Sequence, residues 1–442
     1  MRFLRRLYIA NTFFCVLLFL AACFAVSFYI EPLRFVTVIL LWIWIGLCFW
    51  DLLMLHLPRH QIKIQRQYPD KLSNGDNNSF KITLVSSFPM AVKARILEEV
   101  PVLLQMRNNE FSLRLYPRKE HQVEYKLAPK KRGVYAFGKC NVLISHLGLF
   151  ERKFILEEEL GIPCYPSFIQ MRKYQLLATT DRLVEMGVKR IRRIGSTMEF
   201  DHIKEYVKGD EYKHMNWKAS AKYKRLMVNQ YQEEKSQPIY SIIDIGRVMR
   251  MPFNEMTLLD YAINSTLVLS NAAILKQDRA GMLTFGKSCE NHIAAERNNK
   301  QMKLISEKLY GITTYFEESE FGNLYAFLRR KINKRSLIFL YTNFETLDAL
   351  NRQLPFLRMM AKSHIIVVVV FKNTELQEMS KSEAKNTVEI YNKIIAEKLV
   401  YEKNLIIQEL NRNGLQTIYT APEDLSIKSI NKYLEIKARG LI

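Results

Sequence analysis

The chain has 442 residues, of which 48% are hydrophobic and 25% charged, and its formal net charge is +21. The apolar content excludes a disordered chain, while 16 Gly and 13 Pro are too few for a collagen-like or low-complexity protein. The basic excess makes nucleic acid the first partner to consider, but it is spread along the chain rather than gathered in one tail, which is typical of a solvated surface. The length predicts two or three domains of about 150 residues each.

Residues 1–61 contain two long apolar runs, at 7–30 and 35–57. Each is long enough for a transmembrane helix, which needs about 20 residues, and the short connection between them predicts a helical hairpin. Basic residues stand at both outer ends of the pair: Arg2, Arg5, Arg6, Arg59, His60 and Lys63. By the positive-inside rule both ends face the cytoplasm. We therefore expect a two-span protein of the cytoplasmic (inner) membrane, with both termini and the soluble domains in the cytoplasm.

A cleaved lipoprotein signal is the alternative for this end of the chain. Leu20-Ala21-Ala22-Cys23 resembles a bacterial lipoprotein processing site behind a basic start. The apolar run continues through residues 24–30, however, where a mature lipoprotein normally becomes polar, so retained spans are favoured. Labelling with a radioactive fatty acid would distinguish the two. The six cysteines form no Cys-x-x-Cys pair, so we expect reduced thiols and no thiolate metal site.

Residues 62–166 are predicted to form a small β-sandwich-like domain. Short runs in which apolar and polar residues alternate mark half-buried strands, as in 80–85, 111–115 and 122–127. Turn signals such as Ser73-Asn74-Gly75-Asp76 and Arg132-Gly133 separate them. No catalytic cluster is visible here, so the expected role is that of a spacer or interaction platform.

Residues 236–442 are predicted to form a doubly wound, Rossmann-like α/β domain. Apolar strands are expected at 238–244, 280–285, 335–341, 364–371 and 415–419, with a short edge strand at 288–294. Helices are expected at about 257–277, 297–310, 380–412 and 425–438. Nearly continuous apolar strands fit a parallel sheet that is covered on both faces, and strand–helix alternation implies right-handed crossovers.

In such a sheet, ligands lie at the carboxyl ends of strands near a switch in strand order. Asp244 ends the first predicted strand, and Thr342-Asn343 follows the strand at 335–341. These residues are the candidate site, although an acid at the end of a first strand is by itself a weak signal.

The linker at 167–235 contains a specific motif. It runs Glu205-Tyr206, Gly209-Asp210, Asn216-Trp217-Lys218-Ala219-Ser220-Ala221 and Leu226-Met227-Val228. This motif resembles the signature of bacterial proteins that carry the "domain of unknown function 58" and usually work with MoxR-type AAA+ ATPases. Arg132-Gly133-Val134-Tyr135, Leu147-Gly148-Leu149-Phe150 and the two spans also agree, so the resemblance covers nearly the whole chain. It implies a von Willebrand factor A-type domain at 236–442.

Such domains often hold a divalent cation in a metal-ion-dependent adhesion site, whose pattern is Asp-x-Ser-x-Ser, a loop Thr and a later Asp. Here Asp244 has the first position, but Gly246 and Val248 replace the serines and Asn343 replaces the later Asp. Thr313 or Thr314, with Thr314 preferred, is expected to supply the loop hydroxyl, and Thr342 lies beside Asn343. Because Mg²⁺ needs hard oxygen ligands, we expect a degenerate site, no required cofactor, and at most weak Mg²⁺ binding.

The motif residues have two readings that the sequence leaves open. They either lock the linker onto the α/β domain or form a contact site for the ATPase. In the first reading Gly209-Asp210 is a turn, with Asp210 capping a helix that begins at Glu211, and Trp217 is anchored under the sheet. Asn216 and Ser220 would then satisfy loop backbone groups.

Three classes of function remain. The favoured one is a membrane-anchored adaptor that works with a MoxR-type ATPase in the assembly or activation of envelope or metalloprotein complexes, with other membrane or client proteins as partners. The second is a membrane-bound enzyme acting on lipid or envelope precursors. It is disfavoured because the sequence has no Gly-x-Ser-x-Gly and no phosphate-binding loop. The third is nucleic-acid binding through the basic patch Lys189, Arg190, Arg192 and Arg193, for which we prefer membrane lipid or an acidic protein.

Overall fold

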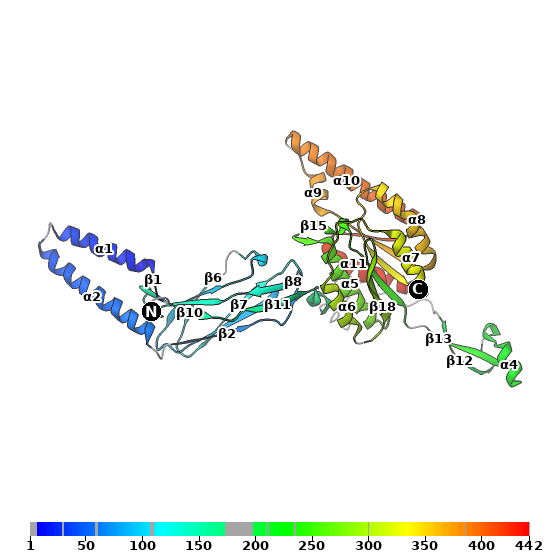
Figure 1. The fold of residues 1–442 in the computed structure, drawn as a ribbon, viewed down its shortest axis with the longest axis horizontal. Helices are drawn as coiled ribbons and strands as arrows, with labels where there is room; N and C mark the ends of the chain where they lie inside the picture. The colour runs from blue at the N-terminus through cyan, green and yellow to red at the C-terminus, as the bar shows by residue number, and fades with distance from the viewer. Residues whose placement is uncertain are drawn as a thin grey trace. The chain divides into compact units, whose positions relative to one another are not determined.

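The structure, a computed structural model, falls into two compact units, residues Met1–Tyr165 and Pro166–Ile442 (Figure 1). It describes residues 7–28, 31–57, 61–106, 110–172, 198–208, 210, 212–233, 236–298, 300–384 and 386–441. The boundary between the units falls beside the predicted end of the β-rich region.

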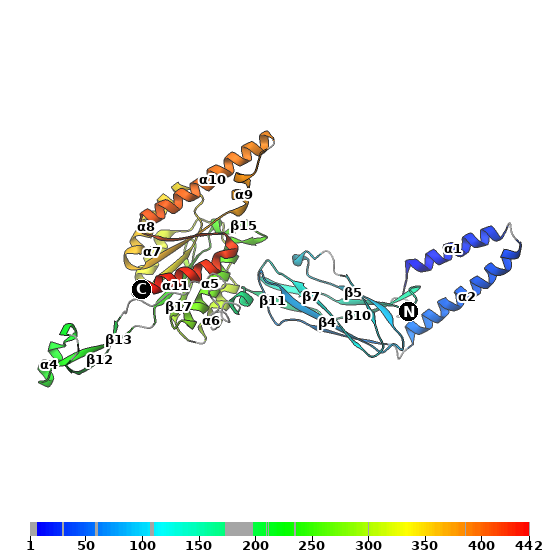
Figure 2. The ribbon, with the colours of Figure 1, turned by 180° about the vertical axis from the view of Figure 1, so that it is seen from behind.

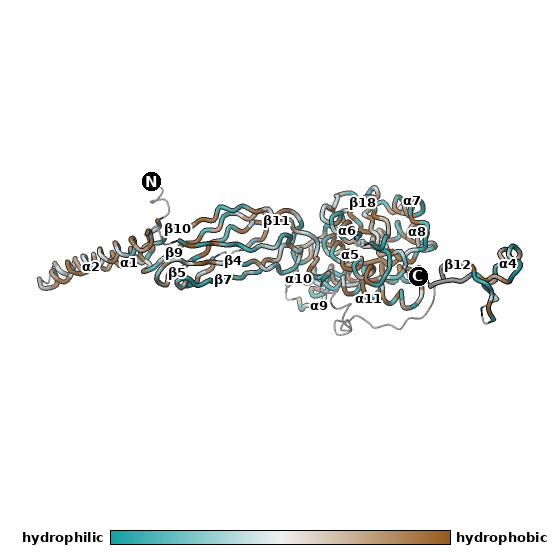
Figure 3. Tube along the Cα trace, turned by 90° about the horizontal axis from the view of Figure 1, so that it is seen from below, coloured by the Kyte–Doolittle hydropathy of each residue, from teal (hydrophilic) through white to brown (hydrophobic). Residues whose placement is uncertain are grey.

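The first unit begins with a short strand and two apolar helices. Strand β1 (Leu7–Ile9) precedes α1 (Asn11–Ser27) and α2 (Glu31–His56), and hydrophobic residues run along both helices (Figure 3). Within α2, Leu33–His56 is long and apolar enough to cross a membrane, and only 11% of its most apolar window is buried. The first predicted span is wrong at its start, because residues 7–9 pair with strand β10 instead of entering the helix. At about 1.5 Å per residue, the 17 residues of α1 are near the lower limit for a span.

A β-sandwich-like domain follows the helices and buries one core between its sheets. One sheet has the order β1-β10-β9-β5-β6, and two three-stranded sheets, β2-β4-β7 and β3-β11-β8, provide the remaining strands. Buried side chains alternate with exposed ones along β5 and over most of β7, as period-2 patterning requires. The strands are β2 (Ile62–Gln67), β3 (Leu72–Ser73), β4 (Asn78–Ser86), β5 (Val92–Glu98), β6 (Glu110–Leu115), β7 (Glu120–Leu127), β8 (Gly133–Phe137), β9 (Cys140–Ser145), β10 (Phe150–Leu156) and β11 (Leu160–Tyr165).

The turn between β9 and β10 holds the carboxyl end of α2. The buried carboxylate of Asp51 accepts hydrogen bonds from the backbone N–H groups of Leu147 and Phe150, both at 3.1 Å. Arg152 donates to the carbonyl of Leu55 at 2.6 Å. Residues 147–150, which carry part of the family resemblance, therefore fix the apolar helices to the sandwich-like domain.

The second unit contains a six-stranded sheet with the order β18-β17-β14-β19-β20-β21. Five strands are parallel and the edge strand β18 is antiparallel. The strands are β14 (Pro238–Asp244), β17 (Arg279–Phe285), β18 (Cys289–Glu296), β19 (Leu337–Tyr341), β20 (Ile365–Phe371) and β21 (Gln416–Thr420). The chain passes from β14 to β17 and later returns to the other side of β14 as β19. The switch point therefore lies between β14 and β19, and the doubly wound fold is confirmed.

Helices cover both faces of this sheet (Figures 1 and 2). Alternation along β14 sends Ile239 and Ile243 toward one face and Tyr240 and Ile242 toward the other. The first face carries α5 (Leu258–Leu275), α6 (Gln301–Tyr310) and α11 (Leu425–Ala438); the second carries α7 (Phe321–Lys331), α8 (Leu347–Ser363) and α10 (Thr387–Arg412). α5 is also apolar enough to span a membrane, but 78% of its apolar window is buried, as in a core helix.

Two features of this unit differ from the prediction. Helices α7 and α8 were not predicted, and α8 contains Pro355, which does not favour a helix interior. The single helix expected at 380–412 is two helices, α9 (Thr374–Lys381) and α10. The break occurs because Ser382 is extended and the side chain of Asn386 caps α10 by accepting from the N–H of Glu389 at 2.9 Å.

The linker contains a small antiparallel hairpin, β12 (Met198–Glu205) and β13 (Met227–Glu233). A 3-10 helix, Tyr212–His214, and the short helix α4 (Trp217–Tyr223) lie between the two strands. Strands β15 (Pro252–Phe253) and β16 (Met256–Thr257) form a second, very short hairpin before α5.

Candidate functional site

The buried carboxylate of Asp244 lies at the switch point of the sheet and is 1% exposed. One of its oxygens accepts a hydrogen bond from Thr342 Oγ1 at 2.7 Å, immediately after β19. The other accepts from the N–H of Gly246 at 2.8 Å and from the hydroxyl of Ser319. Burial raises the pKa of Asp244, and these three neutral donors oppose the rise. The structure thus brings together two residues, Asp244 and Thr342, that the sequence placed at neighbouring strand ends.

Ser319 takes the place that the sequence analysis gave to Thr314. The backbone N–H of Tyr315 donates to the carbonyl of Ile245 at 2.8 Å, so the loop before α7 is pinned beside the end of β14. That register carries the Ser319 hydroxyl, four residues further on, to Asp244. The loop hydroxyl that donates to Asp244 is thus that of Ser319, and a hydroxyl-bearing residue just ahead of a helix was the signal that could have found it.

Gly246 is the residue that makes room for this arrangement. A Cβ at position 246 would overlap the Ser319 hydroxyl and lie 3.1 Å from both Asp244 Oδ1 and the carbonyl of Glu317. The backbone of Gly246 has a φ of −73°, so its conformation does not require glycine. Glycine is required because there is no space for a side chain at position 246. The adhesion-site pattern would supply a hydroxyl from this position, and here Ser319 supplies it.

The side chain of Asn343 is held by an ammonium group. Lys403, on α10, donates to Asn343 Oδ1 at 2.8 Å and also to the carbonyl of Phe344. Burial lowers the pKa of Lys403 to about 8, and the nearby carboxylate of Glu345 opposes that decrease. The sequence gave no indication of Lys403, which lies 60 positions beyond Asn343.

The residues at these strand ends do not fit a divalent cation. Gly246 and Val248 have no side-chain oxygen, both Asp244 oxygens already accept hydrogen bonds, and the Asn343 oxygen faces a fixed ammonium. A Mg²⁺ ion needs six oxygens in near-octahedral geometry. Across the described ranges no group of three or more His, Cys, Asp or Glu is placed to hold a metal.

The signature motif organises the β12–β13 hairpin. Asn216 caps α4 by accepting from the N–H of Ala219 at 3.0 Å, and its amide donates to Asn229 Oδ1 at 2.8 Å. The hydroxyl of Ser220 donates to the carbonyl of Asn216 and accepts from the N–H of Met227, both at 2.8 Å. The prediction that Asn216 and Ser220 satisfy backbone groups is confirmed.

Asp210 and Glu205 stabilise the same end of the hairpin, where Glu205 is paired with Met227. Asp210 accepts from the N–H of Val207 at 3.0 Å and pairs with Lys204 at 2.9 Å, and these two interactions lower the pKa of its carboxyl. Asp210 therefore stabilises its own turn through Lys204 and Val207, instead of capping a helix as predicted. Glu205 pairs with Arg225 at 3.5 Å on an exposed surface.

Trp217 and Lys218 are exposed at the start of α4. The Trp217 side chain is 70% exposed, so the prediction that it is anchored under the sheet is wrong. Asn216 and Ser220, its neighbours in the motif, make the hydrogen bonds that fix α4. The Trp217 indole remains on the surface. The backbone N–H of Tyr206, also a motif residue, pairs with the carbonyl of Leu226 at 2.8 Å.

Five residues of the predicted sites fall outside the described part of the chain. These are Gly209 of the signature motif and the four residues of the basic patch, Lys189, Arg190, Arg192 and Arg193.

These features define a chain with apolar N-terminal helices, a β-sandwich-like domain and an α/β domain whose hairpin carries the signature motif. Residues 202–392 match the family model described as "Protein of unknown function DUF58", so the chain carries a domain of that family. The "Uncharacterized protein YeaD" of Bacillus subtilis (strain 168) is 24% identical over 245 residues, or 52% of this chain. The chain spans 57% of the length of that curated relative.

Two solved structures are distantly similar to parts of the chain. The conserved hypothetical protein BatB from Bacteroides thetaiotaomicron is 12% identical, with a TM-score of 0.29, over 46% of this chain and 100% of its own. The CARDB domain of the PF1109 protein from Pyrococcus furiosus is 10% identical, with a TM-score of 0.18, over 25% of this chain and 97% of its own. The fold described above rests on the strand order and contacts of the chain itself.

Proposed function

We propose that the protein is a membrane-anchored, cytoplasm-facing interaction protein that presents its α/β domain to a MoxR-type AAA+ ATPase. Together the two would assemble or activate client complexes, of the envelope or of metalloproteins. The observation that carries this proposal is the exposed apolar surface of α10 at residues 388–401, and the choice of partner rests on the family resemblance.

Helix α10 has two different halves. Near its carboxyl end, Ile406 and Leu410 are fully buried in the domain core. In residues 388–401, where the helix extends with α9 beyond the sheet (Figures 1 and 2), seven apolar side chains are 36–68% exposed. At about 3.6 residues per turn they form two stripes on opposite sides of the helix: Val388, Tyr391, Ile395 and Leu399, and Ile390, Ile394 and Tyr401. Single exposed apolar residues are ordinary, but seven on one helical segment are typical of an interaction site.

The charges between these residues favour a protein over a lipid surface as the partner. Residues 387–403 contain three Glu and three Lys, so the polar positions carry no net charge. Helices that lie on anionic membranes are instead rich in Lys and Arg on the polar face. A helix with apolar anchors at spacings of three and four residues suits a groove on another protein.

The N-terminal helices support the proposal of a membrane anchor. Residues Leu33–His56 of α2 are long and apolar enough to span a bilayer, and α1 is a shorter apolar helix. We propose that they form a hairpin with both ends in the cytoplasm, with membrane lipid as a further contact. Among the basic residues at its ends, Lys63 lies in β2, whereas Arg2, Arg5, Arg6, Arg59 and His60 lie outside the described residues.

The Asp244 site enters this proposal as a structural element of the partner-facing edge, without a metal. Its hydroxyl and amide donors and the Lys403 ammonium complete the polar groups that a cation would otherwise bind. Binding of a partner would then depend on the exposed apolar surface of α10 rather than on Mg²⁺ at Asp244.

The test is capture of the ATPase by the full-length protein in lipid nanodiscs, with the ATPase trapped by a slowly hydrolysed nucleotide. We expect Ile394→Asp to reduce capture at least tenfold, because a charge in a buried apolar contact is strongly unfavourable. Leu304→Asp is the matched control, since Leu304 is a 44% exposed apolar residue on α6. Failure of the wild type to retain the ATPase, or equal loss in both variants, would contradict the proposal.

A further inference from the structure

A cavity lies beside the Asp244 site, at the carboxyl ends of β19, β20 and β21. Its volume is about 250 Å³. Its walls are mostly apolar and come from segments far apart in the sequence: Phe253, Phe371, Leu376, Val400 and Pro422. Ligands in open α/β sheets bind at this edge. The cavity is therefore in the place where the fold supports a ligand.

One end of the cavity is polar. Asn343 and Lys403 lie there, and the other charged side chains in the lining are Lys372 and Glu345. Two of the three N–H donors of the Lys403 ammonium are directed to Asn343 Oδ1 and the Phe344 carbonyl. The third is available for an acceptor in the cavity.

We propose that this cavity binds a carboxylate carried on an apolar chain, with the carboxylate at Lys403 and the chain against the Leu376 and Val400 wall. A carboxylate carries one negative charge, which suits the single ammonium of Lys403 because the carboxylate of Glu345 already lies nearby. A phosphate group carries more charge and would need several donors. At about 30 Å³ per water-sized group the volume holds roughly eight to ten non-hydrogen atoms. Octanoate has this size. The same chemistry is offered by the free terminal carboxylate of a peptide that ends in an apolar residue.

The charge on Lys403 makes the binding dependent on pH. Because burial lowers its pKa to about 8, Lys403 is mostly an ammonium at pH 7 and mostly neutral at pH 9. Lys372 and Glu345 line the same cavity, and Glu402 precedes Lys403 on α10. Burial raises the pKa of the lining residue Tyr419, which stays neutral over this range. Affinity for a carboxylate should therefore fall about tenfold between pH 7 and 9, and affinity for an uncharged chain should not.

The experiment measures binding of ¹³C-labelled octanoate to the full-length protein in zwitterionic nanodiscs, with empty nanodiscs subtracted and octanol as the uncharged probe. Lys403→Met should weaken octanoate binding at least tenfold and leave octanol binding unchanged. Leu376→Trp, which fills the cavity, should weaken both. Lys398→Met is the matched control, because Lys398 is an exposed lysine on the same helix, and it should bind octanoate like the wild type.

A second arm separates the two sources of the carboxylate. It uses N-acetyl-Ala-Leu with a free carboxylate and the same peptide as the C-terminal amide. Binding of octanoate alone assigns a free acid, and binding of the free-carboxylate peptide alone assigns a chain terminus. The proposal is overturned if neither probe binds, or if binding is unchanged in Leu376→Trp and between pH 7 and 9. The pH series needs no variant, so it stands even if Lys403→Met does not fold.

Discussion

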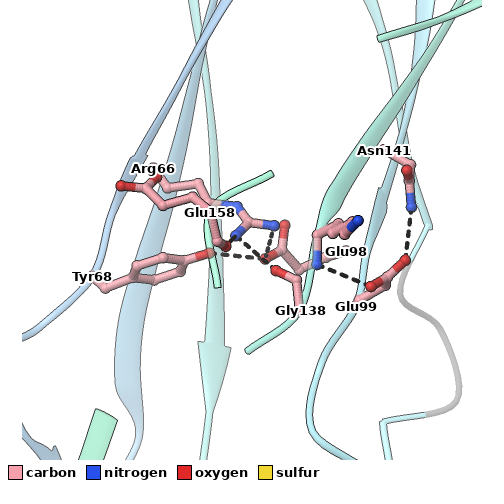
Figure 4. Close-up of polar contacts among 8 residues, drawn as sticks. Arg66, Tyr68, Glu98, Glu99, Gly138, Asn141 and Glu158 are labelled. Atoms are coloured by element: carbon pink, nitrogen blue, oxygen red, sulfur yellow. Dashed lines mark hydrogen bonds and ion pairs between the residues drawn. The ribbon is translucent and has the colours of Figure 1, made fainter. Parts of the chain in front are cut away.

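The sandwich-like domain and the edge of the α/β sheet each bury one carboxyl group, but they compensate it differently. Glu98 is paired with the guanidinium of Arg66 at 3.1 Å, both side chains being fully buried (Figure 4). Tyr68 donates to the same carboxylate at 2.9 Å. Asp244 accepts only from two hydroxyls and one backbone N–H. Burial raises the pKa of both acids, and Arg66 opposes the rise for Glu98.

The Glu98 carboxylate is part of an ion pair inside its domain, whereas the Asp244 carboxylate lies at a candidate ligand site. Arg66 also donates to the carbonyls of Gly138 and Glu158, at 2.9 and 3.0 Å, so its pair with Glu98 connects β2, β5 and two loops (Figure 4). The pair therefore holds these segments of the domain together. Asp244 lies where the fold presents ligands, and its carboxylate is bound by hydroxyls and a backbone N–H, while an ammonium binds the neighbouring Asn343.

The largest effect is expected from breaking the paired charge. Arg66→Met leaves Glu98 buried without its cation, which costs about 3 to 5 kcal/mol. In hydrogen-exchange mass spectrometry, peptides from β4, β5 and β7 should lose about two to four powers of ten in protection. Peptides from β14 and β19, in the other unit, should be unchanged.

Its control removes both charges together. Arg66→Met combined with Glu98→Gln keeps an acceptor for Tyr68 and removes the uncompensated charge, so most of the protection should return. Equal loss in the single and double variants would mean that the network matters for its shape and not for its charge.

A smaller effect is expected from Gly246→Ala, because the new methyl group displaces the Ser319 hydroxyl from Asp244. The loss of a donor to a buried carboxylate should destabilise the domain by about 1 to 3 kcal/mol. Exchange at β14 and β19 peptides measures this loss. In a Ser319→Ala background the same substitution should cost little, and an equal cost in both backgrounds would show that Ser319 is not the group in conflict.

The sequence allowed the sheet edge to be predicted but not the groups that complete it. Asp244 and Thr342 could be placed because each follows an apolar run that ends there, and parallel strands share an edge. Ser319 and Lys403 come from a loop and a helix whose approach depends on packing across the whole domain. No local pattern encodes such contacts.

Hydrophobic patterning was misleading where apolar residues have more than one use. Leu7–Ile9 continues an apolar run and nevertheless forms a strand, because β10 offers a free edge. Trp217 has the size of a core anchor and is exposed, because Asn216 and Ser220 already fix its helix. The sequence shows that a residue is apolar, but it does not show which part of the structure buries that residue.

The most direct test of the account concerns metal at the Asp244 site. Mn²⁺, which substitutes for Mg²⁺ in oxygen-rich sites, can be titrated into the full-length protein in nanodiscs and followed by electron paramagnetic resonance, with Asp244→Asn as the reference. We expect the two proteins to give the same titration, because Ser319, Thr342 and the Lys403 ammonium already occupy the groups that an ion would use. One equivalent of Mn²⁺ bound by the wild type and lost in Asp244→Asn would contradict this account.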